Sequence, residues 1–455
     1  MGINIQFKRG TAAQWTAANP ILAAGEVGFE TDMYRLKVGD GETEWDDLDY
    51  YGAAILLDET AGGTDGETSK APSSNVLFDA LAAQTTALTN HNAAATAVHA
   101  AGAYSLVNSA GIPNRNAIIN GNFAVAQRGA GPFTDATVPL NSDDTYVIDR
   151  WTLLSDGNNI VDVSQETSAT ITNPPFALKL DVETANKKFG IITILENKDS
   201  RRLINQAVSL SFKAKGTKVG GSLTINAVRA AILTWSSTAD AVTSDVVSVW
   251  DAAGTNPTLA ANWNYENVPA ALTALSESYQ TYKIENITID TAAATNVAVF
   301  IWTDDITLDV GDFLHITEVQ LEIGANSTAY EYRPFQQELA LCQRYCYGLT
   351  TVATAEFIAA GSAFSTTVAY PHLFLPVEMR ATPTLIIATA GDWQLDDTVN
   401  APTDVTALVI DDMTFSSKKA VVLKASAASG LTQYRSYYLV GDGNAGRVLA
   451  LAAEL

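Results

Sequence analysis

Residues 25–45 read GEVGFETDMYRLKVGDGETEW, and this stretch decides the local fold at the start of the chain. Apolar side chains alternate with other residues in VGF (27–29) and again in YRLKV (34–38). Alternation with a period of two is typical of a half-buried β-strand. The residues at 31–32 and the GDG at 39–41 suit turns. The stretch therefore predicts a small hairpin with one face in water.

The residues on both sides of the hairpin complete a first block. INIQF at 3–7 alternates like a further strand, and TAAQWTAANP at 11–20 favours a helical turn that closes at the proline. Trp45 and Tyr50 follow the hairpin, and we expect their rings to cover its apolar face. The sequence thus predicts an N-terminal β-domain over 1–52.

The composition of the 455-residue chain bounds its class. Hydrophobic residues make up 47%, which is enough for packed cores, and the formal net charge is −23. A strongly acidic surface repels phosphate groups, so nucleic acid is excluded as a partner. No stretch is long and apolar enough for membrane insertion, and the N-terminus has no signal-peptide core. We expect a protein that is made in a cytoplasm.

Composition changes after the first block. Residues 53–75 are rich in Gly, Ser, Thr and acidic residues, and the Ala-rich run that follows favours a helix with a weak heptad pattern. Gln84 and His91 occupy core positions of that pattern, where polar residues fix the number of strands. We predict a linker and a helical, coiled-coil trimerisation spacer over 53–115. A single amphipathic helix packed on a neighbour is the alternative.

The rest of the chain is mainly β. Short apolar runs separated by Gly, Asn and Asp clusters are typical of sandwiches, and no period of 20–50 residues repeats. We predict a sandwich over 116–334, a helical connector over 335–349 and a smaller β-sandwich over 350–455. The chain's two cysteines, Cys342 and Cys346, exclude a disulfide framework, and we expect two buried thiols that act as small apolar groups.

Residues 5–50 resemble the N-terminal domain family of the phage major tropism determinant, which occurs in bacteriophage tail fibres. The matching residues are Arg9, Gly10, Thr11, Trp15, Asn19, Pro20, Gly25, Glu26, Lys37, Gly39, Asp40, Gly41 and Trp45. Lys8 stands where the family has arginine. The resemblance implies that this domain attaches the protein to baseplate or tail proteins of a virion. The attachment residues that it implies are Arg9, Trp15, Lys37, Asp40 and Trp45.

Two further segments resemble phage tail proteins. One is RNAIINGNFAVAQRG at 115–129, followed by DDTYVIDRWTL at 143–153, and the other is VGDFLHITEVQLEIGANSTAYEYRPFQQELALCQRYCYG at 310–348. The resemblance implies a carbohydrate-module-like jelly roll whose first and last strands pair. Residues 350–455 resemble fibre tips in their run of short predicted strands and in their C-terminal position. The resemblance implies a receptor-binding tip on an elongated homotrimer.

No catalytic motif of the serine hydrolase, zinc protease or phosphate-binding loop type occurs in the sequence. Adjacent acids at 143–144, 304–305 and 411–412 are candidates for a glycosidase pair or for structural Ca²⁺. Adjacent side chains in a strand point to opposite faces, however, so such pairs do not converge on one sugar. We predict that the protein is not an enzyme and has no cofactor, and structural Ca²⁺ stays open.

Aromatic side chains in the last domain are the stronger functional signal. Trp393, Tyr434, Tyr437 and Tyr438 are candidate receptor contacts, because exposed aromatic patches mark interaction sites. The alternative is that they fill the β-core or the trimer seam. His315 is expected in packed core.

The first functional hypothesis is a virion tail fibre that binds a glycan or protein on the host surface. A purely structural virion component, such as a head fibre or baseplate spacer, is the alternative. A polysaccharide depolymerase is the third.

Overall fold

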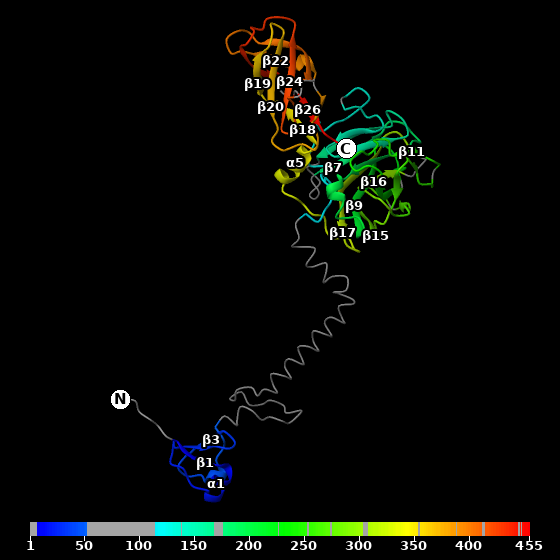
Figure 1. Cartoon of the computed structure of the whole chain (residues 1–455). Helices are drawn as coiled ribbons and strands as arrows, with labels where there is room; N and C mark the ends of the chain where they lie inside the picture. Colours follow the sequence, from blue (N-terminus) through cyan, green and yellow to red (C-terminus); the bar gives the residue numbers. More distant parts are fainter. Residues whose placement is uncertain are drawn as a thin grey trace. The chain divides into compact units, whose positions relative to one another are not determined.

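The structure is a computed structural model. It describes residues 7–51, 114–137, 139–167, 176–225, 227–252, 254–273, 275–303, 308–353, 355–387, 389–411, 415–444, 446 and 448–455. The chain divides into two units at the boundary between residues 107 and 108, and each is described by itself (Figure 1). The predicted spacer over 53–115 lies outside the described residues except for its last two positions.

The first unit contains a three-stranded sheet in the order β1-β2-β3, with β1 parallel to β2 and β2 antiparallel to β3. Its elements are β1 (Lys8–Gly10), α1 (Ala12–Ala18), β2 (Val27–Glu30), β3 (Arg35–Val38) and η1 (Trp45–Asp47). Thr11 and Gln14 form a capping box that starts α1. The predicted hairpin is confirmed, with Val27 opposite Val38.

Trp45 covers the opposite face of the hairpin from the one that we predicted. The Trp45 ring lies on the face of Gly28, where an added Cβ would come within 2.3 Å of it. Val27 and Phe29 lie on the opposite face and are half-buried. The prediction that Trp45 covers the apolar face was therefore wrong, because a flat ring approaches the sheet closely only where glycine leaves room.

Two stacked antiparallel sheets form the sandwich of the second unit, and its apolar core lies between them. The larger sheet has the order β13-β10-β16-β8-β5-β4, with β14 also on β10. Its strands are β4 (Thr145–Ile148), β5 (Trp151–Ser155), β8 (Phe189–Ile194), β10 (Ala227–Trp235), β13 (Trp263–Tyr265), β14 (Leu272–Thr273) and β16 (Asn296–Thr303). The short helix α4 (Asn197–Ser200) follows β8, and β11 (Val247–Val249) pairs with β12 (Thr258–Leu259).

The smaller sheet of the sandwich has the order β15-β9-β17-β7-β6. Its strands are β6 (Val161–Thr167), β7 (Phe176–Val182), β9 (Ala207–Lys218), β15 (Gln280–Thr288) and β17 (Asp312–Ile323). The first segment of the sandwich in the sequence, around residues 117–121, pairs with its last strand, β17. Ala117 N–H donates to Leu321 O (2.7 Å), and Val319 N–H donates to Gly121 O (2.8 Å). The mainly β fold class is confirmed.

The C-terminal region begins with α5 (Phe335–Gln343) and continues into a three-stranded sheet and a closed barrel. The sheet has the order β18-β26-β21, formed by β18 (Cys346–Thr350), β21 (Thr384–Ile387) and β26 (Val448–Ala452). The barrel has the order β19-β20-β24-β23-β22-β25. Its strands are β19 (Phe357–Ala363), β20 (Val368–Phe374), β22 (Trp393–Asp396), β23 (Thr403–Ile410), β24 (Ala420–Ala427) and β25 (Ser436–Gly441), with η3 (Ala390–Asp392) before β22.

The prediction of a second sandwich was wrong, because β25 pairs with both β19 and β22 and so closes the ring. Closure removes the open strand edges that a sandwich keeps. The helical connector is also shorter than predicted, since β18 begins at Cys346. Both thiols are fully buried, as expected. Among the described residues, no helix has the length and apolar character to cross a membrane.

Candidate functional site

The predicted attachment residues of the first unit mainly hold its fold. Trp15 and Trp45 stack with ring centroids 4.0 Å apart, and Trp15 Nε1 donates to Phe29 O (3.0 Å). Both rings are buried, and with Leu22 they form the apolar core of this unit within the described residues. Neither indole is therefore available to a partner in the folded domain.

Lys37 and Asp40 are structural as well. Lys37 is 4% exposed, its Nζ donates to Trp45 O (2.6 Å), and it lies 4.4 Å from the Tyr50 ring centroid. Asp40 accepts hydrogen bonds from Thr43 Oγ1 (2.6 Å) and from two backbone N–H groups of its loop. These bonds lower the pKa of its carboxyl to about 2. Of the five predicted residues, Arg9 and Asp40 are exposed.

One face of the small sheet stays half-exposed within this unit. It carries the side chains of Val27, Phe29, Leu36 and Val38, which we call the N-terminal apolar face. Tyr34 beside it is 82% exposed and contacts the Phe29 ring. The attachment prediction did not include this half-exposed apolar face.

The four aromatic residues predicted as receptor contacts divide into two kinds. Trp393 is 0% exposed and Tyr437 is 3% exposed, and both belong to the barrel core. Their prediction as receptor contacts is corrected, because alternation along β22 and β25 points them inward. Tyr434 and Tyr438 are 77% and 40% exposed, so they alone of the four can touch a partner.

The smaller sheet of the sandwich presents a polar outer face that the sequence did not single out. Its inward residues belong to the apolar core, and the side chains between them point outward. Four of the chain's fourteen lysines lie on this face in a protein of net charge −23. We call it the lysine face; its outward residues include Glu166, Lys179, Lys213, Lys215, Lys283, Phe313, His315 and Glu318.

His315 is the organising residue at one end of the lysine face. Its Nδ1 lies 2.7 Å from Glu166 Oε2 and its Nε2 lies 3.0 Å from Thr217 Oγ1. Burial lowers the pKa of the imidazole, against the opposing influence of Glu166. The hydrogen bond from His315 in turn lowers the pKa of Glu166. His315 is 3% exposed, but it is fixed among polar groups and not in the apolar core.

A β-bulge in β17 aims Glu318 onto the same face. The register of β17 on β9 shifts between Thr317 and Gln320, and Glu318 has φ 52°. A non-glycine residue in this conformation costs on the order of 1 kcal/mol. Glu318 accepts from the Tyr332 hydroxyl, and its Oε2 lies 2.8 Å from Lys213 Nζ. The strained position therefore serves to build a polar cluster, which is a common use of bulges.

Lys215 and Tyr279 lie next to each other on the lysine face, where Lys215 lacks an ion pair and the Tyr279 hydroxyl lacks a hydrogen-bond partner among the described residues. Lys215 Nζ lies 4.9 Å from the Tyr279 ring centroid, and within the described part of the chain it has no ion pair. The Tyr279 hydroxyl is buried without a hydrogen-bond partner among the described residues. Burial, with Glu166 and Glu318 nearby, raises the pKa of that hydroxyl. A cavity of about 410 Å³ on the same sheet is lined by residues such as Lys213, Lys283 and Tyr332, but not by Lys215 or Tyr279.

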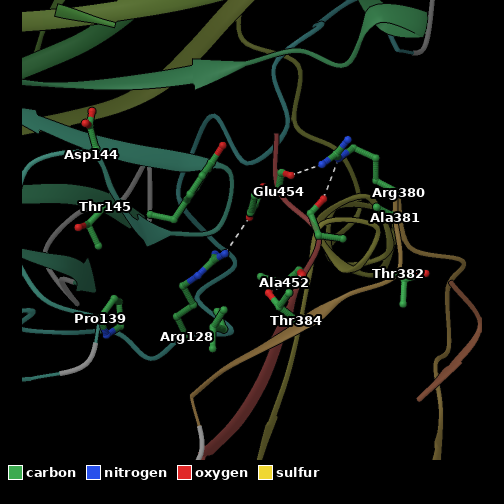
Figure 2. Close-up of a pocket in the computed structure, with 13 residues that line it drawn as sticks. Arg128, Pro139, Asp144, Thr145, Arg380, Ala381, Thr382, Thr384, Ala452 and Glu454 are labelled. Carbon is green, nitrogen blue, oxygen red and sulfur yellow. Dashed lines mark hydrogen bonds and ion pairs between the residues drawn. The ribbon is translucent and has the colours of Figure 1, made fainter. Parts of the chain in front are cut away.

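A buried ionic joint connects the sandwich to the C-terminal region. Glu454 lies between Arg128 Nη2 (2.9 Å) and Arg150 Nη1 (2.5 Å), and all three side chains are less than a tenth exposed. Burial would raise the pKa of Glu454, but Arg150 and Arg128 lower it below its usual value. Arg150 thus serves an ion pair with Glu454. Figure 2 shows Arg128 joined to Glu454, and Arg380 directed at the carbonyl oxygens of Ala453 and Glu454.

A cavity of about 530 Å³ lies beside this joint and is lined from both β-domains (Figure 2). Arg128, Arg380 and Glu454, which line it, are already engaged with one another or with backbone oxygens. The cavity is therefore a feature of the joint and gives no ligand assignment.

Of the predicted acid pairs, only Asp143 and Asp144 are both among the described residues. Asp143 Oδ1 accepts from Ser155 N–H (2.7 Å), whereas Asp144 has φ 56° and a buried Oδ1 without a donor among the described residues. In the part of the chain that the structure describes, no group of three or more His, Cys, Asp or Glu side chains is arranged to hold a metal ion. Three acids of the other pairs, at 304, 305 and 412, lie outside the described residues.

We expect Asp144→Asn to raise the melting temperature at pH 7.5 and to raise it less at pH 4. Burial, Asp143 and Asp245 raise the pKa of Asp144 to about 6, above its usual 3.8. The folded state therefore disfavours the charged carboxylate, a cost that is present above about pH 6 and absent once pH falls below 3.8. Thermal unfolding at both pH values tests this, with the exposed Asp290→Asn as control. An equal gain at both pH values would point to the backbone conformation and not to charge.

The N-terminal unit, with its stacked indoles, buried lysine and Asp40-capped loop, can now be compared with known proteins. Residues 5–43 match the family model of the major tropism determinant N-terminal domain. The predicted resemblance of the first block is thereby confirmed. The hyaluronoglucosaminidases of Streptococcus pyogenes phages H10403 and H4489A are each 44% identical to this chain over 48 residues. That segment is 10% of this chain and only 14% and 13% of the lengths of those two proteins.

Solved structures with partial likeness include the enzymatically active domain of bacteriophage CBA120 tailspike protein 4. It is 12% identical, with 47% of this chain and 22% of that chain covered and a TM-score of 0.28. TmCBM61 in complex with beta-1,4-galactotriose is 14% identical, with 46% of this chain and 100% of that chain covered and a TM-score of 0.25.

Proposed function

We propose that this chain is a phage tail-fibre protein that attaches virions to a glycan on the host-cell surface. The observation that carries the proposal is the match of residues 5–43 to the N-terminal domain of the major tropism determinant. The domain fastens the fibre to tail or baseplate proteins, and the N-terminal apolar face is the surface that it offers them. The fibre is a homotrimer, so weak single sites act together on one cell.

The glycan site in this proposal is the lysine face of the sandwich. Sugars are bound by convergent polar groups that hydrogen-bond to hydroxyls and by aromatic rings that cover the faces of the sugar. Lys215, whose Nζ lies 4.9 Å from the Tyr279 ring centroid, is a charged group that has no ion pair among the described residues. Tyr332, 45% exposed, supplies a ring at the edge of the 410 Å³ cavity. The bulge at Glu318 supports a functional use, since the fold bears its strain for a position on this face.

Purified full-length protein should reduce phage adsorption to host cells in a dose-dependent manner. Lys215→Ala should raise the half-inhibitory concentration about tenfold, because hydrogen bonds from charged groups contribute about 1.5 kcal/mol or more. The matched control is Lys187→Ala, a sandwich lysine paired with Asp156 away from this face. Equal inhibition by both variants would remove the lysine face from the proposal. Lack of inhibition by correctly folded protein would favour a purely structural virion component.

We further propose that the protein binds its glycan without cleaving it. The likeness to hyaluronoglucosaminidases is limited to 48 residues, and no catalytic motif of the serine hydrolase, zinc protease or phosphate-binding loop type occurs in the sequence. Incubation with host polysaccharide should therefore leave the number of reducing ends unchanged. An increase over a heat-denatured control would instead establish a depolymerase.

A further inference from the structure

The outer face of the barrel over three neighbouring strands is rich in exposed aromatic residues. Inward residues of these strands belong to the barrel core, for example Ala359, Leu373 and Leu439. The residues between them point outward. We call this the aromatic face; it consists of Phe357, Ala360 and Ser362 of β19, Val368, Tyr370, His372 and Phe374 of β20, and Ser436 and Tyr438 of β25.

The aromatic residues of this face make two groups of contacts, and Phe364, which follows β19, belongs to the second group. Phe357 and Tyr438 are in edge contact with centroids 5.4 Å apart, and Phe357 and Phe374 both line a cavity of about 390 Å³. At the far end, Phe364 contacts Tyr370 with centroids 6.0 Å apart. Ala360 and Ser362 of β19 lie between the aromatic residues of β20 and Tyr438 of β25.

The size of the exposed aromatic surface suits a protein partner. Phe357 is 56% exposed, Phe364 62%, Phe374 78% and Tyr438 40%. At roughly 150–250 Å² for each side chain, they leave roughly 350–600 Å² of aromatic surface in water. A stable interface takes about 800 Å² from each partner, so these four side chains alone would fill about half of one.

The charge of this surface selects the partner. None of the nine residues of the aromatic face is Asp, Glu, Lys or Arg. Two copies of a chain with net charge −23 repel each other, so their contact has to be made through uncharged surfaces. Depletion of charge and enrichment in Phe and Tyr are also the marks of the core of a protein interface. The lysine face, by contrast, is polar and charged.

We propose that the aromatic face is where copies of this chain pack against one another in the fibre. The inference rests on the proposed oligomeric fibre and adds the surface that joins the copies at the barrel. It assigns Tyr438 to the contact between copies, one of the alternatives that the sequence left open, and not to the receptor. The phenylalanines are then buried in the assembly.

The test is site-specific photo-crosslinking of the full-length chain. p-Benzoylphenylalanine replaces Phe374 in one variant and, as control, Val409 in another. Val409 is 50% exposed on β23, the strand farthest from β19 around the barrel ring. Irradiation of the Phe374 variant should give covalent bands at twice and three times the 48.3 kDa chain mass, and the Val409 variant should not.

Light scattering on the same samples separates this inference from the fibre proposal. A multimer mass with no chain adduct at 374, or with equal adducts at 374 and 409, overturns the inference and leaves the fibre proposal standing. If residue 374 crosslinks to added host polysaccharide and not to a second copy of the chain, the aromatic face binds glycan, and the inference is overturned as well. A monomer mass overturns both.

Discussion

Glu454→Ala should lower the free energy of unfolding of the C-terminal unit by about 3–5 kcal/mol. The substitution removes the carboxylate between Arg128 and Arg150, whose side chains are 1% and 3% exposed. Two buried guanidinium groups would then lose the carboxylate that both of them contact, and charge repulsion in a dry site is strong. Urea unfolding followed by tryptophan fluorescence measures the change, since Trp393 lies inside the barrel.

The matched control for this prediction is Glu378→Ala. Glu378 pairs with Lys419 at 3.4 Å, but their side chains are 53% and 74% exposed. Exposed pairs contribute about 0–1 kcal/mol, so this variant should unfold almost as the natural protein does. Replacing Arg128, Arg150 and Glu454 together by apolar residues of similar size should recover much of the loss, because no charge is then left unpaired. A Glu454→Ala protein as stable as the control would mean that water solvates the joint.

Trp45→Ala should unfold the N-terminal domain and leave the C-terminal unit folded. Trp45 is 1% exposed, stacks on Trp15 and covers Gly28, and its carbonyl oxygen accepts from Lys37. Removing a buried tryptophan costs about 3–5 kcal/mol. A core built on two indoles and one leucine rarely supplies more than about 3–5 kcal/mol in so small a domain. The loss therefore matches the whole stability of the domain.

Limited proteolysis of the full-length protein tests the second prediction. In the Trp45→Ala variant, cleavage should appear within residues 7–51, while the C-terminal unit stays resistant. Gly28→Ala should have the same effect, because the added Cβ meets the Trp45 ring. Tyr51→Ala, at a side chain that is 75% exposed, is the control and should keep the natural pattern. Protection of residues 7–51 in the Trp45→Ala variant would show that the indole stack is dispensable.

The candidate glycan face could be read from the sequence only in part. Alternation predicts β17, but simple parity puts His315 on the same face as Val319, and this led to the expectation of a core histidine. The bulge at Glu318 adds one residue between them, so Val319 enters the core while His315 points to Glu166. A bulge depends on the pairing of β17 with β9, which the sequence of β17 alone does not contain.

The aromatic residues of the tip show the same limit. Tyr437 and Tyr438 are adjacent in the sequence, so alternation along a strand puts them on opposite sides, and the structure shows this in β25. The sequence could not say which side faces inward. That is decided when β25 pairs with β19 and β22 and the ring closes, because closure gives every strand an inside.

Four features could be predicted from sequence patterns: the hairpin at 25–45, the mainly β class, the buried thiols and the N-terminal family match. These follow from period-two alternation, turn residues and a motif of adjacent positions. The tertiary structure alone decided the closed barrel, the side of the hairpin that Trp45 covers and the joint at Glu454. Glu454 and Arg128 are 326 positions apart in the sequence. Only the packing of two domains buries both side chains, and each buried charge then needs the other as its counter-charge.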